Sequence, residues 1–512
     1  MVTIPKPRTP EGVKLNPADL AAGRYGTYEM VQNWGPEKTF EYSLLAQAEA
    51  SSTLSEINPE IVPPAHAREI SEKANLKCIS PERIRENEEK TGHDVNGLNV
   101  SLGEVVKAEA ASDINKLRTS ADTTETAKAL QVKGSLEIIA DSVENLRDIV
   151  IDKSLEWIDT VDIEQTHNFD ALPSVAGRAF AHYAEMLQSG LSLLKFVYLF
   201  SVKGKWGDAT GNHHSATSSG VDGMKLQEAY CRKLGLGWMI ASAQVPGREF
   251  DADVVYVLGR IGETIANIAQ YVKTGKGDDR DIFIYLGKKK KGSSAMPHKD
   301  IKGGNPVNEE QTRSFRNYIR GTLVTAMANC QMDYARDLDN SANTRINFQD
   351  GFNFADHVIR SLASTVYSLG LRKERCRARI ERSYGVVTSE QVLTRLTDRR
   401  YVPNPLTRKE ADVLVGRLAT AAYESKRQFA DVLLEEPEIT LRISSEDIKT
   451  LTDPFRFIGQ SKEIIREIAS RYHHQRTFEI ENGDPEMQAV NIRLNLWNSL
   501  KKIADYEWKQ GG

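Results

Sequence analysis

The 512-residue chain has few cysteines, no long apolar run and no excess of charge of one sign. Its four cysteines are scattered, without a Cys-x-x-Cys pair, which excludes a disulfide framework or a thiolate zinc site and fits a reducing compartment. The most apolar stretch, residues 193–202, is interrupted by Lys195 and is too short to span a bilayer. With 67 Lys and Arg against 71 Asp and Glu, the formal charge of −4 argues against a nucleic-acid or membrane-surface binder.

The start of the chain also lacks the apolar run of a secretory signal, because Pro5, Pro7 and Pro10 stand in its place. We therefore expect a cytoplasmic protein without a membrane partner. Alternating strand patterns are equally scarce, and the best short candidate covers residues 281–286.

Helical periodicity, by contrast, is abundant in the middle of the chain. Three stretches carry apolar residues at alternating intervals of three and four, the pattern of the interior stripe of a helix. The stripes are Leu136, Ile139, Val143, Leu146 and Val150; Val254, Leu258, Ile261, Ile265, Ile268 and Val272; and Ile359, Leu362, Val366 and Leu369. Long helices bury such stripes against one another, so we predict an all-α fold built on a helical bundle.

Proline and charge distribution suggest three domains. Residues 1–118 hold shorter helical segments punctuated by prolines, and residues 119–373 hold the long stripes. Residues 374–512 are rich in charge and broken by further prolines, which indicates a separate C-terminal helical domain.

The most informative segment is Gly-Ser-Ser-Ala-Met-Pro-His-Lys at residues 292–299, within a loop predicted to span residues 287–306. A Gly-Ser-Ser start after the basic run 288–291 offers hydroxyls and backbone N–H groups to an anion. An ordinary surface turn could have the same sequence. A nucleotide-binding loop of the Walker type is rejected, because the Lys-Ser/Thr that should follow Gly292 is absent.

This segment resembles the signature loop of the fumarase/aspartase superfamily, and its Ala-Met-Pro-His form is similar to the adenylosuccinate lyase branch. Further segments resemble that family, in the family's order, between residues 24 and 345. They are Arg24-Tyr25; His93-Asp94-Val95; Thr119-Ser120-x-Asp122; Thr166-His167 with Ala171 and Pro173; Gln244 with Arg248; and Arg336, Ser341 and Arg345.

The resemblance implies a long central helical bundle with smaller N- and C-terminal helical domains, and it makes the bundle, residues 119–373, the oligomerisation core. It also implies an anti β-elimination that releases fumarate from adenylosuccinate, giving AMP, and from the succinyl-carboxamide ribotide of purine biosynthesis. The family forms homotetramers whose active sites are shared between subunits, and it uses no cofactor and no metal. The histidine pairs at residues 213–214 and 473–474 do not alter that expectation, because no carboxylate or cysteine cluster accompanies them.

Four catalytic residues are carried over from the resemblance. Ser293 would be the general base, and Lys299 with the loop N–H groups would stabilise the aci-carboxylate formed when the proton leaves. His167 would protonate the departing nitrogen, and Glu310 would orient it. Without the other family motifs, His167 would be interpreted as a structural histidine and Glu310 as a solvated carboxylate on a helix.

The resemblance also supplies the substrate-binding residues. The phosphate end would be held by Arg24, Tyr25, Arg336, Ser341 and Arg345, since arginine forks suit oxyanions. The succinyl or ribose-phosphate portions would contact His93, Thr119, Ser120 and Gln244. The other expected substrate-binding residues are Asp94, Ser294, Met296 and Asn305.

Three departures from the family pattern bear on the substrate. Phe169 replaces a usual glutamine, and four extra residues separate Lys299 from Asn305. Asn115 and Gly92 stand where a histidine and a basic residue are common. Two alternatives therefore stay open: a sister lyase acting on another N-succinyl compound, and an inactive lyase-like scaffold.

Overall fold

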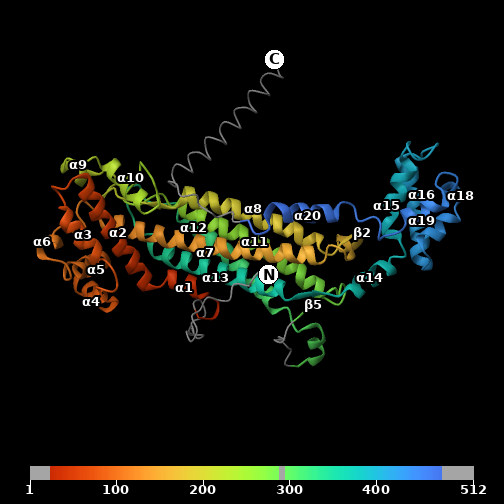
Figure 1. The fold of residues 1–512 in the computed structure, drawn as a ribbon, viewed down its shortest axis with the longest axis horizontal. Coiled ribbons are helices and arrows are strands. Elements are labelled where there is room, and N and C mark those ends of the chain that lie inside the picture. Colours follow the sequence, from red (N-terminus) through yellow and green to blue (C-terminus); the bar gives the residue numbers. More distant parts are fainter. Residues whose placement is uncertain (1–22, 287–294, 476–512) are drawn as a thin grey trace, which may run out of the picture.

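The computed structural model describes residues 23–286 and 295–475. Figure 1 shows an elongated molecule in which a bundle of long helices lies between two smaller groups of helices. The predicted all-α fold is confirmed. Among the described residues, no helix has an apolar stretch long enough to cross a membrane.

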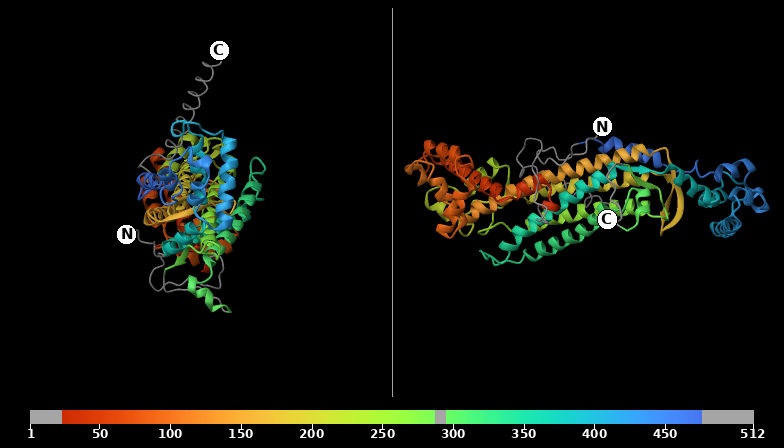
Figure 2. Two further views of the ribbon diagram at one scale, coloured as in Figure 1. Left: turned by 90° about the vertical axis from the view of Figure 1, so that its right-hand side faces the viewer. Right: turned by 90° about the horizontal axis from the view of Figure 1, so that it is seen from below.

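Five long helices make the bundle, and their apolar stripes meet in one core. They are α7 (Ser120–Glu156), α8 (Arg178–Ser201), α11 (Glu249–Lys276), α12 (Val307–Ala328) and α13 (Ser341–Tyr367). The predicted stripe on α7 is 0% exposed at all five positions, and that on α11 is 2% exposed or less. Each fully buried side chain of this size contributes about 1.5–3 kcal/mol. In the views of Figure 2, α12 and α13 run along one edge of the bundle.

The N-terminal group packs around its own apolar cluster, which includes Leu44, Ile70, Ile84 and Leu98. Prolines occupy the first helical position of three of its helices, where a missing N–H costs no hydrogen bond. The helices are α1 (Tyr28–Asn33), α2 (Pro36–Ile57), α3 (Pro64–Lys73), α4 (Pro81–Thr91), α5 (Asp94–Gly103) and α6 (Ala108–Ala111).

The C-terminal group is an excursion from the bundle. Its core, between Val392 and Leu451, is separate from that of the bundle. The elements are α14 (Lys373–Arg382), η3 (Val386–Thr388), α15 (Ser389–Thr397), α16 (Arg408–Ser425), α17 (Phe429–Leu434), α18 (Pro437–Thr440) and α19 (Ser445–Leu451). The chain then returns, and α20 (Ser461–Tyr472) packs on α7 and α8 through Ile465 and Ile468. The three domain bounds given above stay a prediction.

Short strands join these helices. An antiparallel hairpin, β1 (Val161–Thr166) and β2 (Phe169–Val175), follows α7 and was not expected from the sequence. The predicted strand at residues 281–286 contains β5 (Phe283–Tyr285), which pairs with β6 (Leu369–Leu371). Leu369, the last stripe residue predicted for the third helix, therefore lies beyond α13 in β6. The remaining elements are β3 (Lys203–Gly204), α9 (His214–Ser218), α10 (Gly223–Lys233), β4 (Gly237–Trp238) and η2 (Pro297–Lys302).

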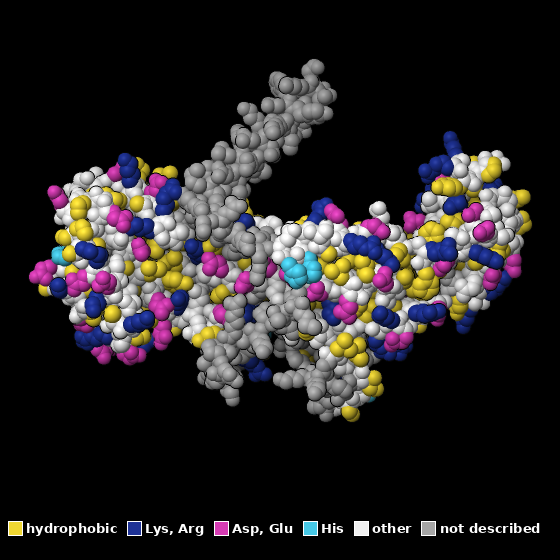
Figure 3. Space-filling model, viewed as in Figure 1, with side chains coloured by type: hydrophobic (Ala, Val, Ile, Leu, Met, Phe, Trp, Pro, Cys, Tyr) yellow, Lys and Arg dark blue, Asp and Glu magenta, His cyan; other side chains and the backbone are white. Residues whose placement is uncertain are grey.

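Charge is distributed evenly over the visible surface. On the face shown in Figure 3, Lys and Arg side chains are interspersed with Asp and Glu along the whole molecule. This agrees with the near-neutral composition and gives this face no large field of one sign.

Candidate active site

A cavity of about 670 Å³ lies at the end of the bundle where α7 and α13 begin. Helices α5, α7 and α13 all present their first residues to it, and helix N-termini favour anions. Eight residues predicted to bind substrate line this cavity: His93, Asp94, Thr119, Ser120, Gln244, Arg336, Ser341 and Arg345.

The start of α7 is fixed by Asp122, which is fully buried. Its carboxylate accepts hydrogen bonds from the backbone N–H of Thr119, at 2.8 Å, and of Gly207, at 2.9 Å. It also forms an ion pair with Lys205, whose side chain is 0% exposed. Thr119 and Ser120 therefore line the cavity at a fixed helix start, which Asp122 holds through these contacts.

His93 lies between two polar neighbours at the cavity wall. Its Nδ1 is 3.0 Å from the Asp94 carboxylate, and its Nε2 is 3.3 Å from the Ser120 hydroxyl. This contact links the start of α5 to the start of α7.

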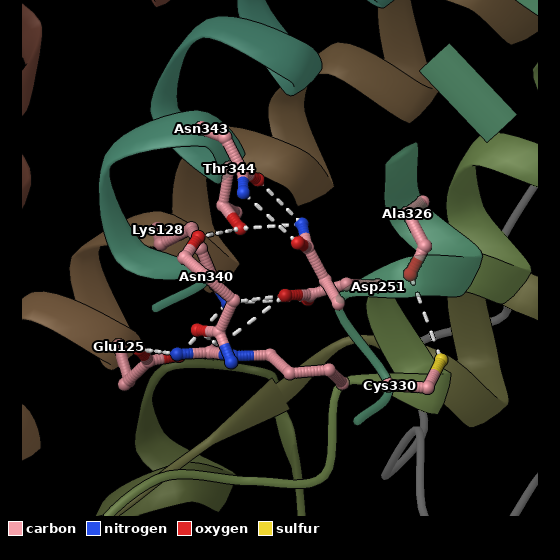
Figure 4. Close-up of polar contacts among 10 residues, drawn as sticks. Glu125, Lys128, Asp251, Ala326, Cys330, Asn340, Asn343 and Thr344 are labelled. Carbon is pink, nitrogen blue, oxygen red and sulfur yellow. Dashed lines mark hydrogen bonds and ion pairs between the residues drawn. The ribbon is translucent and has the colours of Figure 1, made fainter. Parts of the chain in front are cut away.

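A buried charge network forms the floor of the cavity (Figure 4). Arg248, 3% exposed, donates two parallel hydrogen bonds of 2.8 Å to Glu125. Lys128 contacts Glu125 at 2.8 Å and Asp251 at 2.9 Å. Burial by itself would raise the pKa of Glu125, but Lys128 and Arg248 together hold that pKa well below its ordinary value. Glu125 is thus an anion that fixes two cations beneath the site.

Arg336 has an unsatisfied donor at this cavity. Its Nη1 is buried and has no hydrogen-bond partner among the described residues. Burial lowers the pKa of its guanidinium, and the positive charge of Arg248 does so as well. Ser341 and the exposed Arg345 lie on the first two turns of α13 beside it. A cation with a free donor, flanked by a hydroxyl and a second cation, suits an oxyanion such as phosphate.

The proposed acid lies elsewhere on the chain. His167 is exposed at the tip of the β1–β2 hairpin, which follows the far end of α7. Because α7 has 37 residues, its two ends are about 55 Å apart. His167 therefore does not reach the cavity of its own chain. Figure 1 shows the same separation, with α5 and β2 toward opposite ends of the bundle.

The end of the signature loop forms a third location. Met296 and Lys299 lie in or next to η2, and Glu310 lies in the first turn of α12, 3.1 Å from the Nζ of Lys273. Ser293 and Ser294 lie outside the described residues. None of the described residues of this segment lines the cavity.

The extra residues before Asn305 close into a tight turn. Gly303 and Gly304 both have positive φ, 80° and 88°, which other residues rarely adopt. The N–H of Gly304 donates to the carbonyl of Lys299 at 3.1 Å, and its own carbonyl accepts from Lys276 at 3.2 Å. The extra residues thus form the end of η2 and the turn after it, and α12 begins two residues after Asn305.

Arg24 and Tyr25 also lie apart from the cavity. The Tyr25 ring packs edge-on against Phe315 of α12, with centroids 4.8 Å apart, and the exposed Arg24 guanidinium lies 5.9 Å from that ring. The predicted site residues are therefore distributed over separate regions of the chain.

Known protein families and relatives support the family resemblance found in the sequence motifs. The profile of the family described as "Lyase" matches residues 27–321, and that described as "Adenylosuccinate lyase C-terminus" matches residues 385–468. An adenylosuccinate lyase from Methanocaldococcus jannaschii is 31% identical over 462 residues, covering 90% of this chain and 96% of the relative. The chain belongs to the adenylosuccinate lyase family.

Other members of the adenylosuccinate lyase family match over similar lengths. The Bacillus subtilis protein is 28% identical over 431 residues, covering 84% of this chain and 95% of its own. Among solved structures, a fumarate lyase from Mesorhizobium sp. BNC1 superposes with a TM-score of 0.74 at 20% identity, covering 87% of this chain and 98% of its own. The 3-carboxy-cis,cis-muconate lactonizing enzyme from Pseudomonas putida gives 0.73 at 20% identity, over 88% and 98%. The predicted family and the fumarase/aspartase-like fold are both confirmed.

The buried charge network beneath the cavity of this adenylosuccinate lyase family member was not predicted from the sequence. Glu125 and Lys128 interrupt the buried face of α7 three residues apart, and such charges inside an otherwise apolar helix could have indicated a buried pair. In residues 23–286 and 295–475, no group of three or more His, Cys, Asp or Glu side chains is arranged to hold a metal ion.

Proposed function

We propose that this protein is a carbon–nitrogen lyase that releases fumarate from adenylosuccinate, giving AMP, and from the succinyl-carboxamide ribotide of purine biosynthesis in the cytoplasm. Membership of the adenylosuccinate lyase family supports the reaction. The observation that carries the substrate class is the buried, unpartnered Nη1 of Arg336 at a cavity that Ser341 and Arg345 also line. A phosphate monoester would satisfy that donor.

In the proposed mechanism, Ser293 removes the proton beside a succinyl carboxylate, and the electron pair is held as an aci-carboxylate. Lys299 and the N–H groups of the loop stabilise the extra negative charge. The C–N bond then breaks as His167, oriented by Glu310, donates a proton to the departing nitrogen. Thr119, Ser120 and Gln244 hold the succinyl carboxylates.

The proposed active site is shared between subunits of a homotetramer. Two observations support this arrangement: the cavity and His167 lie at opposite ends of α7, and the hairpin bearing His167 exposes apolar side chains. Phe169 is 77% exposed and Leu172 is 42% exposed. Exposed apolar groups on a hairpin favour burial against another surface, here the cavity of a second copy.

Fumarate release by the purified protein tests the proposal, with the two N-succinyl nucleotides offered in parallel. We expect release from both, and a loss of at least about 100-fold in kcat for His167→Ala and Ser293→Ala. His182→Ala is the matched control, because His182 is exposed on α8, outside the proposed machinery. A folded wild-type protein that leaves both substrates intact would refute the proposed activity. An active monomer in light scattering would refute the shared site alone.

A further inference from the structure

The hairpin that carries His167 stands on the first helix of the C-terminal group. Ile163 of β1 is buried against Ile380 of α14 and Val387 of η3. These three side chains form a small apolar cluster apart from the cores of the bundle and of the C-terminal group. The base of the hairpin is therefore packed on α14 and η3.

One side chain of α14 bonds to both strands of the hairpin. Arg379, 5% exposed, donates from Nη1 to the Asp162 carboxylate of β1 at 2.5 Å. Its Nη2 donates to the Ile163 carbonyl of β1 at 3.1 Å and to the Asp170 carboxylate of β2 at 2.6 Å. A planar guanidinium has the fixed fork of donors that such a three-way contact needs, whereas a lysine ammonium does not.

The carboxylates that receive Arg379 are held by further donors. Asp162 is 4% exposed and also accepts from Arg280 at 3.2 Å. Asp170 accepts from the Gln165 amide at 3.0 Å, across the hairpin. Asp170 is three residues from His167, so the contact with Arg379 lies about 10 Å from the tip.

The tip itself is conformationally demanding. His167 and Asn168 form a two-residue loop with φ of 54° and 67°, the pattern of a type I′ turn. Asn-Gly is the usual sequence there, and a histidine in the left-handed region is uncommon. The register also shifts between Glu164 and Gln165, next to the Asp170 contact. A loop of this kind keeps one orientation only if its strands are held in register.

We propose that Arg379 is a positioning residue for the catalytic hairpin: by bonding β1 and β2 together, it sets the register from which His167 is presented to the substrate. The proposal rests on the proposed function, in which His167 is the general acid. It gives α14, the first helix of the C-terminal group, an indirect role in catalysis, exerted through the hairpin. Arg379 itself touches neither the cavity nor its lining residues.

The test compares Arg379→Ala and Arg379→Lys with Arg377→Ala, because Arg377 is an exposed arginine of the same helix that donates to Glu381 at 2.9 Å. We expect Arg379→Ala to lower kcat by about 100-fold, as misplacing a catalytic group by about 1 Å does, with KM changed less than about threefold. Free guanidinium at millimolar concentration should restore part of kcat in Arg379→Ala and none in His167→Ala. Arg379→Lys should stay impaired, and Arg377→Ala should match the wild type.

Hydrogen exchange of the hairpin peptide, residues 161–175, gives a readout independent of substrate. Exchange should rise in Arg379→Ala and stay at the wild-type level in Arg377→Ala. Wild-type kcat in Arg379→Ala, or a loss of kcat without faster hairpin exchange, would overturn the proposal. If Arg379→Ala does not fold, Asp170→Asn replaces it: this variant keeps the Arg379–Asp162 pair, and normal kcat and exchange in it would also overturn the proposal. An inactive wild type with a rigid hairpin that loosens in Arg379→Ala would refute the proposed function and retain the structural role.

Discussion

The Nε of Arg248 donates to the side-chain oxygen of Asn340 at 3.2 Å, and so joins the residue before α11 to the residue before α13. Gln244 and Ser341, both at the cavity, are four residues and one residue away from these partners. The Arg248 guanidinium, which Glu125 holds in place, thus links the starts of the two helices.

Glu125→Gln should destabilise the protein strongly. The substitution keeps the side-chain volume but removes one negative charge, so that the buried Arg248 and the nearby Lys128 share the single carboxylate of Asp251. We therefore expect a loss of about 3 kcal/mol in the free energy of unfolding. Urea denaturation measures it. Glu104→Gln is the control, because it breaks an exposed pair with Arg83 and should cost less than about 1 kcal/mol. Equal costs for the two variants would contradict a supporting role for the network.

Arg336→Ala should weaken binding of the product nucleotide. Loss of a charge-assisted hydrogen bond costs about 1.5–3 kcal/mol, or roughly 10–100-fold in affinity. Calorimetric titration with AMP checks this, and adenosine, which lacks the phosphate, should bind the variant and the wild type alike. Arg417→Ala, in the C-terminal group, is the control. An unchanged AMP affinity would remove Arg336 from the phosphate site.

Asp122→Asn should reduce both stability and turnover. Lys205 is fully buried, and removal of its counter-charge leaves an uncompensated charge that costs about 3–5 kcal/mol. The capping hydrogen bond to Thr119 weakens as well, which loosens the start of α7. Thermal unfolding and kcat are measured together. Asp222→Asn, at the exposed cap of α10, should leave both stability and kcat nearly unchanged, because asparagine caps a helix about as well as aspartate does.

His213 should make stability depend on pH on the acid side of neutrality. Burial lowers the pKa of His213, and Lys205 lowers it further, against the opposing effect of Asp208 and two other carboxylates. Between the folded pKa and the unfolded value of about 6.5, the unfolded chain binds the additional proton. The contribution of His213 to stability is therefore fully present above about pH 6.5 and is lost as the pH falls from that value to the folded pKa.

The variant His213→Asn isolates that effect, because Asn tolerates the positive φ of 55° and does not titrate. Unfolding midpoints at about pH 7.5 and 5.5 should differ less in the variant than in the wild type. His182→Asn serves as control, since His182 is exposed. Parallel pH profiles for wild type and His213→Asn would contradict the assignment.

The bundle could be predicted from the sequence because its determinants are local. The apolar residues from Leu136 to Val150 recur with the helical period, and an apolar stripe of that length indicates a helix face that packs against other helices. The hairpin was missed because its turn, His167-Asn168, lacks the glycine that marks such loops, and because Asp162 is buried by pairing with arginines distant in sequence.

The residue types of the candidate site could be predicted from the sequence, but the positions of these residues relative to one another in the fold could not. Ser120 and Arg336 meet at one cavity, while His167 is placed far away by the rigid length of α7. Motif order along a chain carries no information on which copies of a motif meet. The network around Glu125 depends on Arg248, 123 residues later, and no local pattern reports such a pair.

The separate core of the C-terminal group has an evolutionary consequence. Because the chain leaves the bundle after β6 and returns to it as α20, residues 392–451 of this group can diverge in sequence while the bundle keeps its last helix. The constraint on drift falls on α14 instead, whose buried face serves the hairpin. Residues between Val392 and Leu451 should therefore tolerate exchange among relatives as a block, provided that the helix leading into them is retained.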